Sequence, residues 1–391
     1  MEEDSEWLRK TAIKRACSGE DHRSIWTSLG KSRSWFYNWL RRFKEDDDDW
    51  FKSIPFGPGT PANRTRAEIE ELVQFARSRL YNQDLFCGAQ AILWQLEDWN
   101  VEPLPSLRTI NRILRRHGLT HKRTGRYRPK GTDYPSPEAS QPNSVHQADF
   151  VGPRFLHDGA DKRRFYVLNC IDVATGRCAV QAITDGKGNT NAAIWKIWRR
   201  LGLPKYLQVD NEMTFCGSPN SPRSLGPLIR LCLPMGVEPV FIPVREPWRN
   251  GVVEKFQGFW DKGVWQKRQI PDTAALNRTN MDFEKRHNRA WRYSKLNGKT
   301  PLQALAESKA ALSFPETAKV PKDFLTQPES GRYHLIRLIR GNGKLDVFGE
   351  KFHVDPDLRY EYVWATIDIE KQRLYLKHDG EQVDDWKYIT K

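Results

Sequence analysis

The sequence lacks the features that mark a secreted, zinc-binding or membrane-spanning protein. Its six cysteines are scattered and include no CxxC pair, which argues against a zinc ribbon and against a disulfide framework. No stretch approaches the roughly 18–20 apolar residues that cross a bilayer. The N-terminus, MEEDSEWLRK, is acidic and has no basic-then-apolar signal pattern. We therefore predict an intracellular protein with no membrane partner and no structural zinc.

The sequence also has fewer acidic than basic residues. The chain has 63 Lys and Arg residues against 49 Asp and Glu residues, and this gives a formal net charge of +14. A balance of this kind favours a polyanionic partner. At 391 residues the chain is too long for one ordinary hydrophobic core, so several domains are expected.

Two segments in the N-terminal third each predict three short helices. Apolar residues recur at helical spacing within 6–44 and again within 65–118, and Gly30 precedes the last helix of the first segment. Three helices with a glycine-containing turn before the last are typical of helix-turn-helix DNA-binding domains. We predict such domains at 1–46 and 64–130, with linkers at 47–63 and 131–143.

The last helix of the second segment begins a strongly basic stretch. Between Ser106 and Lys130 there are nine Lys or Arg residues and no acid. Because neutralising DNA phosphates requires clustered, unopposed cations, this stretch predicts contact with the DNA backbone. The predicted contacts are Arg108, Arg112, Arg115, Arg116, Lys122, Arg123, Arg126, Arg128 and Lys130, together with Arg41 and Arg42 at the end of the first domain.

The remaining two thirds of the chain alternate between strand and helix patterns. Two or three antiparallel strands precede parallel strands that alternate with helices, and this predicts an α/β core at 144–296. We expect a mixed five-stranded sheet with helices on both faces. A connector at 297–330 leads to short strands and turns at 331–391, which predict a small β-barrel.

Three acidic residues occupy unusual places in the α/β core. Asp149 lies inside a strand, Asp210 follows the carboxyl end of another strand, and Glu254 lies in the first turn of a helix. Carboxylates are depleted in strand interiors and costly to bury alone. Three that converge would repel one another, and hard cations with oxygen ligands such as Mg²⁺ relieve that repulsion. Two ions about 4 Å apart activate a water or 3′-hydroxyl and stabilise the leaving oxygen of a phosphodiester.

The segments HQADFVG, QVDNEMTF and RNGVVEKF, which carry these acids, resemble the DDE motif of retroviral integrases and bacterial insertion-sequence transposases. The resemblance covers residues 145–295. The helical segments before it and the predicted barrel after it resemble bacterial transposases of the insertion-sequence and Mu type. Together, these resemblances imply a multidomain protein with an RNase H-like core. Asp149, Asp210 and Glu254 would be catalytic and would hold two Mg²⁺ or Mn²⁺ ions.

The resemblance also implies an activity and partners. The expected activity is binding of the terminal repeats of a mobile element, followed by DNA 3′-end cleavage and strand transfer into target DNA. The expected partners are double-stranded DNA of the element ends and the target, further copies of the chain in a dimer or tetramer on DNA, and an ATPase helper protein. The expected location is the bacterial cytoplasm, associated with the nucleoid.

Two other functions remain open at this point: a catalytically silent DNA-binding regulator derived from a transposase, and an RNase H-like nuclease without strand transfer.

The residues around Glu254 predict further phosphate contacts. These are Arg249, Asn250, Lys255 and Lys262.

The spacing of the acids departs from the family pattern. The frequent spacing of 35 residues leads from Asp210 to Glu246 (246 − 210 − 1 = 35), whereas Glu254 gives 254 − 210 − 1 = 43. Glu246 precedes Pro247, which disfavours helical backbone at that position. Glu254 lies on a periodic helix, and the breaker-rich loop 216–222 has room for the additional residues. We therefore favour Glu254 as the third acid.

Overall fold

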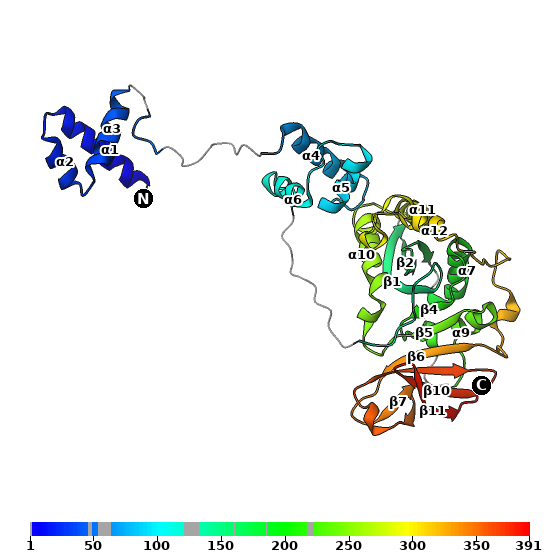
Figure 1. Cartoon of the computed structure of the whole chain (residues 1–391). Helices are drawn as coiled ribbons and strands as arrows, with labels where there is room; N and C mark the ends of the chain where they lie inside the picture. Colours follow the sequence, from blue (N-terminus) through cyan, green and yellow to red (C-terminus); the bar gives the residue numbers. More distant parts are fainter. Residues whose placement is uncertain are drawn as a thin grey trace. The chain divides into compact units, whose positions relative to one another are not determined.

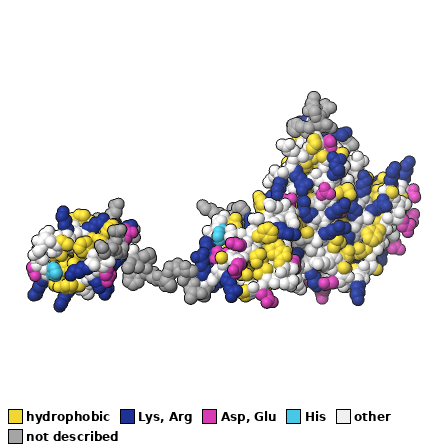
Figure 2. Space-filling view, turned by 90° about the horizontal axis from the view of Figure 1, so that it is seen from above, with side chains coloured by type: hydrophobic (Ala, Val, Ile, Leu, Met, Phe, Trp, Pro, Cys, Tyr) yellow, Lys and Arg dark blue, Asp and Glu magenta, His cyan; other side chains and the backbone are white. Residues whose placement is uncertain are grey.

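The computed structural model divides the chain into two compact units, Met1–Ala67 and Glu68–Lys391 (Figure 1). Lys and Arg side chains are frequent on the visible surface of both units (Figure 2), in keeping with the net charge of +14. Among the described residues, no helix combines the length and apolar character that a membrane span needs. The structure describes residues 2–45, 49–53, 64–120, 133–158, 161–184, 186–217 and 223–391.

The first unit contains three helices, α1 (Glu2–Cys17), α2 (His22–Ser28) and α3 (Arg33–Lys44). They lie in the segment where the sequence predicts three helices. The Ser32 hydroxyl accepts a hydrogen bond from the Trp35 amide at 3.1 Å and so caps α3. Gly30, in the turn between α2 and α3, has a φ of +63°, a conformation that favours glycine.

The second unit begins with another three helices, α4 (Ala67–Asn82), α5 (Ala89–Asp98) and α6 (Leu107–Arg116). Ser106 caps α6, because its hydroxyl accepts from the Thr109 amide at 3.2 Å. The three helices share a buried core to which α6 contributes Ile110, Ile113 and Leu114. These apolar positions turn the polar side of α6 toward solvent.

A mixed sheet follows, built from β1 (Val145–Asp158), β2 (Asp161–Asp172), β3 (Cys178–Ile183), β4 (Tyr206–Val209) and β5 (Glu238–Phe241). The first three strands are antiparallel neighbours, while β4 is parallel to β1 and β5 is parallel to β4. The strand order across this part is β3-β2-β1-β4-β5. These pairings match the mixed sheet that the strand and helix patterns predict.

Helices cover both faces of this sheet (Figure 1). One face packs on α7 (Thr190–Leu201) and α9 (Pro227–Cys232), and the other packs on α10 (Gly251–Trp260) and α11 (Thr273–Ala290). Successive strand residues alternate between the two cores: Leu168 faces the α7 side and Val167 faces the α10 side. Two further short helices are α8 (Met213–Cys216) and α12 (Pro301–Ser308).

The prediction of a sheet limited to five strands has to be corrected. Strand β6 (Arg332–Leu338) pairs in parallel with β5, and β9 (Tyr362–Asp368), β10 (Arg373–His378) and β11 (Glu381–Lys387) extend the same sheet. The sheet therefore has nine strands, in the order β11-β10-β9-β6-β5-β4-β1-β2-β3. Without β6, the outer edge of β5 would present unpaired backbone groups.

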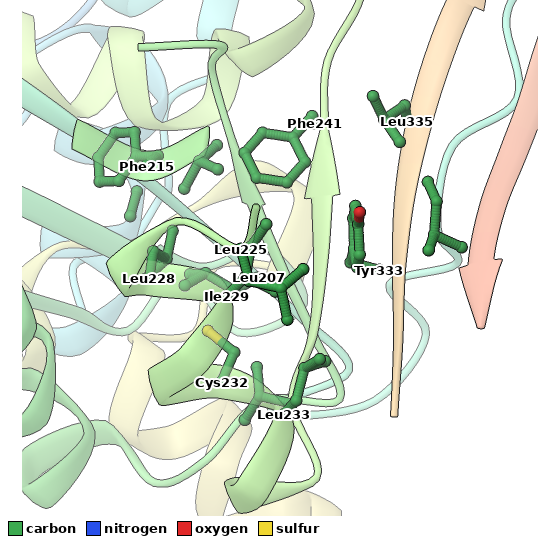
Figure 3. Close-up of a cluster of buried hydrophobic side chains, with 14 of the residues drawn as sticks. Leu207, Phe215, Leu225, Leu228, Ile229, Cys232, Leu233, Phe241, Tyr333 and Leu335 are labelled. Carbon is green, nitrogen blue, oxygen red and sulfur yellow. The ribbon is translucent and has the colours of Figure 1, made fainter. Parts of the chain in front are cut away.

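The C-terminal strands are thus part of the core, and the prediction of a separate small β-barrel at 331–391 is not confirmed. The hairpin of β7 (Lys344–Val347) and β8 (Glu350–His353) pairs only with itself, and no pairing among the described strands closes a barrel. Figure 3 shows Tyr333 and Leu335 of β6 packed beside Phe241 of β5, with Leu207 of β4 in the same cluster. Residue periodicity predicts which face of a strand is buried, but it does not predict the neighbouring strand.

Candidate active site

The register of the parallel pair β1–β4 brings Asp149 and Asp210 together. Gln147 of β1 lies beside Gln208 of β4; Asp149 follows two residues after Gln147 within β1, and Asp210 follows two residues after Gln208, directly after the end of β4. Two residues along a strand return to the same face, and neighbouring strands lie about 4.8 Å apart. The two carboxylates therefore lie side by side on one face of the sheet, Asp149 within β1 and Asp210 directly after the carboxyl end of β4.

The two glutamines one step earlier hold the start of helix α10 against the sheet. The Gln147 Oε1 atom accepts from the amides of Val252 and Val253 at 3.1 and 3.2 Å, although Gln147 is distant in sequence. Gln147 therefore caps the start of α10, whose own N-cap residue, Asn250, makes no side-chain capping hydrogen bond. The Gln208 Nε2 atom donates to the Arg249 carbonyl at 3.1 Å.

Helix α10 carries Glu254 to the same face. Gln257, one turn further, donates from Nε2 to Asp149 Oδ2 at 2.9 Å, and so ties the helix directly to the first aspartate. Residues 254 and 257 lie on one side of a helix. The negative charge of Glu254 is near enough to raise the pKa of Asp149. The structure therefore brings all three sequence-predicted acids into one neighbourhood.

Burial raises the pKa values of all three acids, and neighbouring carboxylates add to the rise at Asp149 and Asp210. Burial is the largest cause at Asp149; hydrogen bonds from Gln257 and the Phe150 amide oppose it, and the charges of Glu254 and Glu212 add to it. Burial also raises the pKa of Asp210 to about 6, and the neighbouring Asp149 and Glu212 charges contribute. Burial raises the pKa of Glu254. The ionised form of each carboxylate is therefore disfavoured, and a bound cation would relieve this.

No Lys or Arg of the described residues forms an ion pair with Asp149, Asp210 or Glu254. On the same sheet face, Asn169 is fully buried directly opposite Asp149, and its amide has no hydrogen-bond partner within the described part of the chain. Carboxylate and amide oxygens are the ligands that Mg²⁺ and Mn²⁺ prefer. The donor set fits such ions, although no group of three His, Cys, Asp or Glu residues among those described is already arranged as a metal cluster.

Glu246, the alternative third acid by spacing, is engaged elsewhere. Its carboxylate accepts from the Tyr362 hydroxyl at 2.7 and 2.8 Å and forms an ion pair with Arg249 at 3.0 Å. Its side chain is 12% exposed. It is not among the charges that raise the pKa of Asp149, whereas Glu254 is. The geometry therefore favours Glu254 over Glu246.

A buried arginine from β6 supports the segment that follows Asp210. The Arg337 guanidinium donates to Asn211 Oδ1 at 2.8 Å, and both Arg337 and the Asn211 amide donate to the Ile242 carbonyl, at 3.1 and 2.6 Å. Arg337 is 4% exposed, and burial lowers its pKa to about 10. This network joins the ends of β4, β5 and β6 immediately beside the acids.

Replacing Arg337 is expected to destabilise this junction. Arg337→Met leaves Asn211 Oδ1 without its buried donor, which costs about 1–3 kcal/mol, and removes one of the two donors to the Ile242 carbonyl. Arg337→Lys should recover only part of the loss, because an ammonium does not reproduce the planar fork. Chemical denaturation measures the effect, with the exposed Arg340→Met as the matched control. Equal stability of Arg337→Met and Arg340→Met would show that the network is unimportant.

The predicted DNA contacts of α6 lie mostly on its exposed side. Arg108, Arg112 and Arg115 are exposed, and no described residue forms an ion pair with them. Arg116 differs, because it pairs with the buried carboxylate of Glu70 and so helps to hold α6 on α4. The predicted contacts Lys122, Arg123, Arg126, Arg128 and Lys130 lie outside the described residues.

The predicted contacts in α3 are divided in the same way. Arg41 is exposed and lies 3.9 Å from Glu45 in a solvent-facing pair. Arg42 donates to the Lys52 carbonyl at 2.9 Å, and its guanidinium lies 4.8 Å from the Trp39 ring centroid. Of these two, Arg41 is therefore the one whose side chain is turned to solvent.

Two predicted DNA contacts near Glu254 prove to be internal. Asn250 is 2% exposed and donates to the Ala148 carbonyl at 3.1 Å, so in this structure its side chain holds the start of α10 against β1. The Arg249 side chain is 10% exposed and is held by Glu246 and Tyr362. Sequence patterns do not separate these cases, because both side chains are polar and stand at a helix start. Lys255 and Lys262 are exposed.

Sequence reasoning missed several residues of the site. Gln257 could have been found from its spacing of three from Glu254, which places both on one helix face. Gln147 and Gln208 each precede an aspartate by two residues, which is a usable signal once the strands are assigned. Lys187 and Glu212 form an ion pair beside Asp210. No local pattern predicts that pairing, because the two residues lie on separate segments.

Comparison with known proteins gives structural similarity alone. No protein-family model matches the chain, and neither does any curated protein. The catalytic core domain of HTLV-2 integrase, solved as a dimer in complex with magnesium, is 18% identical with a TM-score of 0.32, over 43% of this chain and 99% of that one. A simian T-cell lymphotropic virus intasome in complex with the PP2A regulatory subunit B56 gamma is 14% identical with a TM-score of 0.35, over 74% and 88%. At these values the function has to be argued from the site itself.

Proposed function

We propose that this chain is a DDE-type transposase or integrase, which cuts the 3′ ends of a mobile element and joins them to target DNA. One observation carries the proposal: the β1–β4 register sets Asp149 beside Asp210, and α10 is fastened to the same strands with Glu254 facing them. Three repelling carboxylates on one face of a sheet, with which no Lys or Arg of the described residues forms an ion pair, suit metal-assisted reaction at a phosphodiester.

In this proposal Asp149, Asp210 and Glu254 hold two Mg²⁺ or Mn²⁺ ions. When bound, these ions supply activation of the attacking water or 3′-hydroxyl and stabilisation of the leaving oxygen. The chain itself contributes placement. Gln257 fixes the orientation of the Asp149 carboxylate. Gln147 fixes the start of α10 against β1, and so fixes the position of Glu254 relative to the strands. Precise placement is worth large factors in rate, because misplacement by about 1 Å costs roughly a hundredfold.

The proposal extends to DNA recognition by both helical segments. The exposed side of α6 offers Arg108, Arg112 and Arg115, and α3 offers Arg41, for contact with DNA phosphates. Two such segments on one chain would add their affinities through effective concentration. Joining two element ends requires at least two active sites, so we propose assembly into a dimer or tetramer on DNA. An ATPase helper remains part of the proposal.

The test is a cleavage and joining assay. Inverted repeats sought in the sequence flanking the gene supply the candidate ends, and the purified full chain is incubated with them and Mg²⁺ or Mn²⁺. We expect nicked 3′ ends and joined products, with at least a hundredfold loss in Asp149→Asn, on the order of losing one electrostatic catalytic group. Asp379→Asn, at a carboxylate that is 91% exposed, is the matched control.

Each other outcome identifies an alternative. Binding to the ends without any cleavage supports the catalytically silent regulator. Cleavage without joined product supports an RNase H-like nuclease. Cleavage that is equal in Asp149→Asn and Asp379→Asn would place the chemistry at a different site.

A further inference from the structure

We propose that Lys187 is the residue that contacts the DNA phosphate next to the three carboxylates, and that Glu212 holds its ammonium in place until DNA arrives. This inference rests on the proposed function and adds a substrate-binding residue to it. The proposed ligand is a phosphodiester group, and neither a sequence motif nor a residue spacing identifies Lys187 as its contact.

The position of Lys187 is the first argument. It lies in the 3₁₀ turn Lys187–Asn189 that precedes α7 and forms an ion pair with Glu212, two residues after Asp210. Its ammonium lies 4.4 Å from the ring centroid of Phe150, the residue after Asp149, and 4.9 Å from that of Tyr166. The charge is therefore fixed between the segments that carry both aspartates.

The second argument is that Lys187 stands out among the charges of this site. It is the cation whose charge opposes the rise in the pKa of Asp210. Within the described part of the chain, no other Lys or Arg forms an ion pair with Glu212. A DNA phosphate that approaches these four carboxylates is repelled by them, and a fixed ammonium beside them offsets part of that repulsion. Lys187 is therefore placed where incoming DNA needs a positive charge.

The third argument is that Lys187 can exchange partners. Its side chain is 23% exposed, and of its three N–H groups one donates to Glu212. It lines a cavity of about 250 Å³ together with Thr190, Met213 and Thr214. Glu212 keeps other partners if the lysine leaves, because its carboxylate also accepts from the Thr214 hydroxyl at 3.0 Å. The two aromatic rings hold a cation without consuming its hydrogen-bond donors.

The alternative is that Lys187 has a structural role alone and only neutralises the charge of Glu212. The salt dependence of DNA binding separates the two, because each phosphate contact on duplex DNA contributes about 0.9 to the slope of log Kobs against log salt. Binding is measured on the candidate end DNA with Mg²⁺, in the full chain carrying Asp149→Asn so that no cleavage occurs. We expect Lys187→Met to reduce the slope by about 0.9. Lys187→Arg should keep the slope, and Lys196→Met, at an exposed lysine of α7, should also keep it.

The double variant Lys187→Met/Glu212→Gln decides the question. It leaves no unpaired charge, so it also covers the case in which Lys187→Met alone fails to fold. Under our proposal its slope stays reduced, because the phosphate contact is gone. A slope restored to that of the parent protein would overturn the proposal and leave a purely structural ion pair. If the wild-type chain never cuts DNA while the double variant shows the reduced slope, the phosphate contact stands and the proposed catalytic function falls.

Discussion

Glu254→Gln is expected to lower DNA cleavage and joining by at least about a hundredfold, the size of effect seen when one preorganised electrostatic group is lost. The substitution keeps the shape of the side chain and removes the negative charge that faces Asp149. A neutral amide at this position weakens the oxygen ligand set for divalent ions. The measurement is the same end-cleavage assay, together with calorimetric titration of Mn²⁺ into the DNA-free protein.

Glu246→Gln is the matched comparison, because it makes the same chemical change at the residue that simple counting would select. We expect cleavage to remain within about tenfold of the parent, which corresponds to 1.4 kcal/mol or less in the barrier. The expected loss is in stability, about 1–3 kcal/mol, since the Arg249 and Tyr362 donors lose a charged acceptor. An inactive Glu246→Gln beside an active Glu254→Gln would reverse our assignment of the third acid.

Removal of residues 331–391 is expected to abolish cooperative folding of the α/β core. The β6 residues Tyr333 and Leu335 are buried with Phe241 and Leu233 in one apolar cluster (Figure 3), and Arg337 supports the segment after Asp210. A chain that ends at residue 330 would expose this cluster and the edge of β5. Differential scanning calorimetry and near-ultraviolet circular dichroism should show no cooperative melt and no fixed aromatic environment.

The control for this truncation is removal of the first unit. A chain that starts at residue 64 keeps the second unit intact, so its main unfolding transition is expected to stay within a few degrees of that of the full chain. A chain of residues 1–330 that melts cooperatively at the temperature of the full chain would show that the C-terminal strands are an independent domain after all.

The two aspartates could be predicted from local context because their signal is local. A carboxylate inside an apolar strand, and another at the end of a strand, are each costly unless a site explains them. The parallel register of β1 and β4 then brings the two aspartates side by side. Asp149 and Asp210 therefore needed only strand assignment. Glu254 needed an argument from helix geometry against a spacing rule, and the hydrogen bonds of Glu246 now support that choice.

The predicted DNA contacts show that local sequence context does not predict the partner of a side chain. Arg112 and Arg116 carry the same charge on the same helix and both are exposed, yet Arg116 pairs with Glu70 while no described residue forms an ion pair with Arg112. Asn250 stands among polar residues at a helix start, yet it is buried against β1. The partner of each side chain comes from a distant segment. Charge and periodicity therefore identify candidates but do not separate an exposed side chain from one that is held internally.

Sequence patterns were enough to predict the two trios of helices, the basic stretch, the mixed sheet and the meeting of the three acids, because these depend on periodicity and on residue chemistry along short segments. Only the folded chain shows that the C-terminal strands complete a nine-stranded sheet, that Gln147 and Gln208 hold the start of α10 while Gln257 binds Asp149, and that Lys187 pairs with Glu212. Each of these depends on which distant segments become neighbours. That choice is made by the packing of the whole core, since strand period and local propensity are the same for many alternative neighbours.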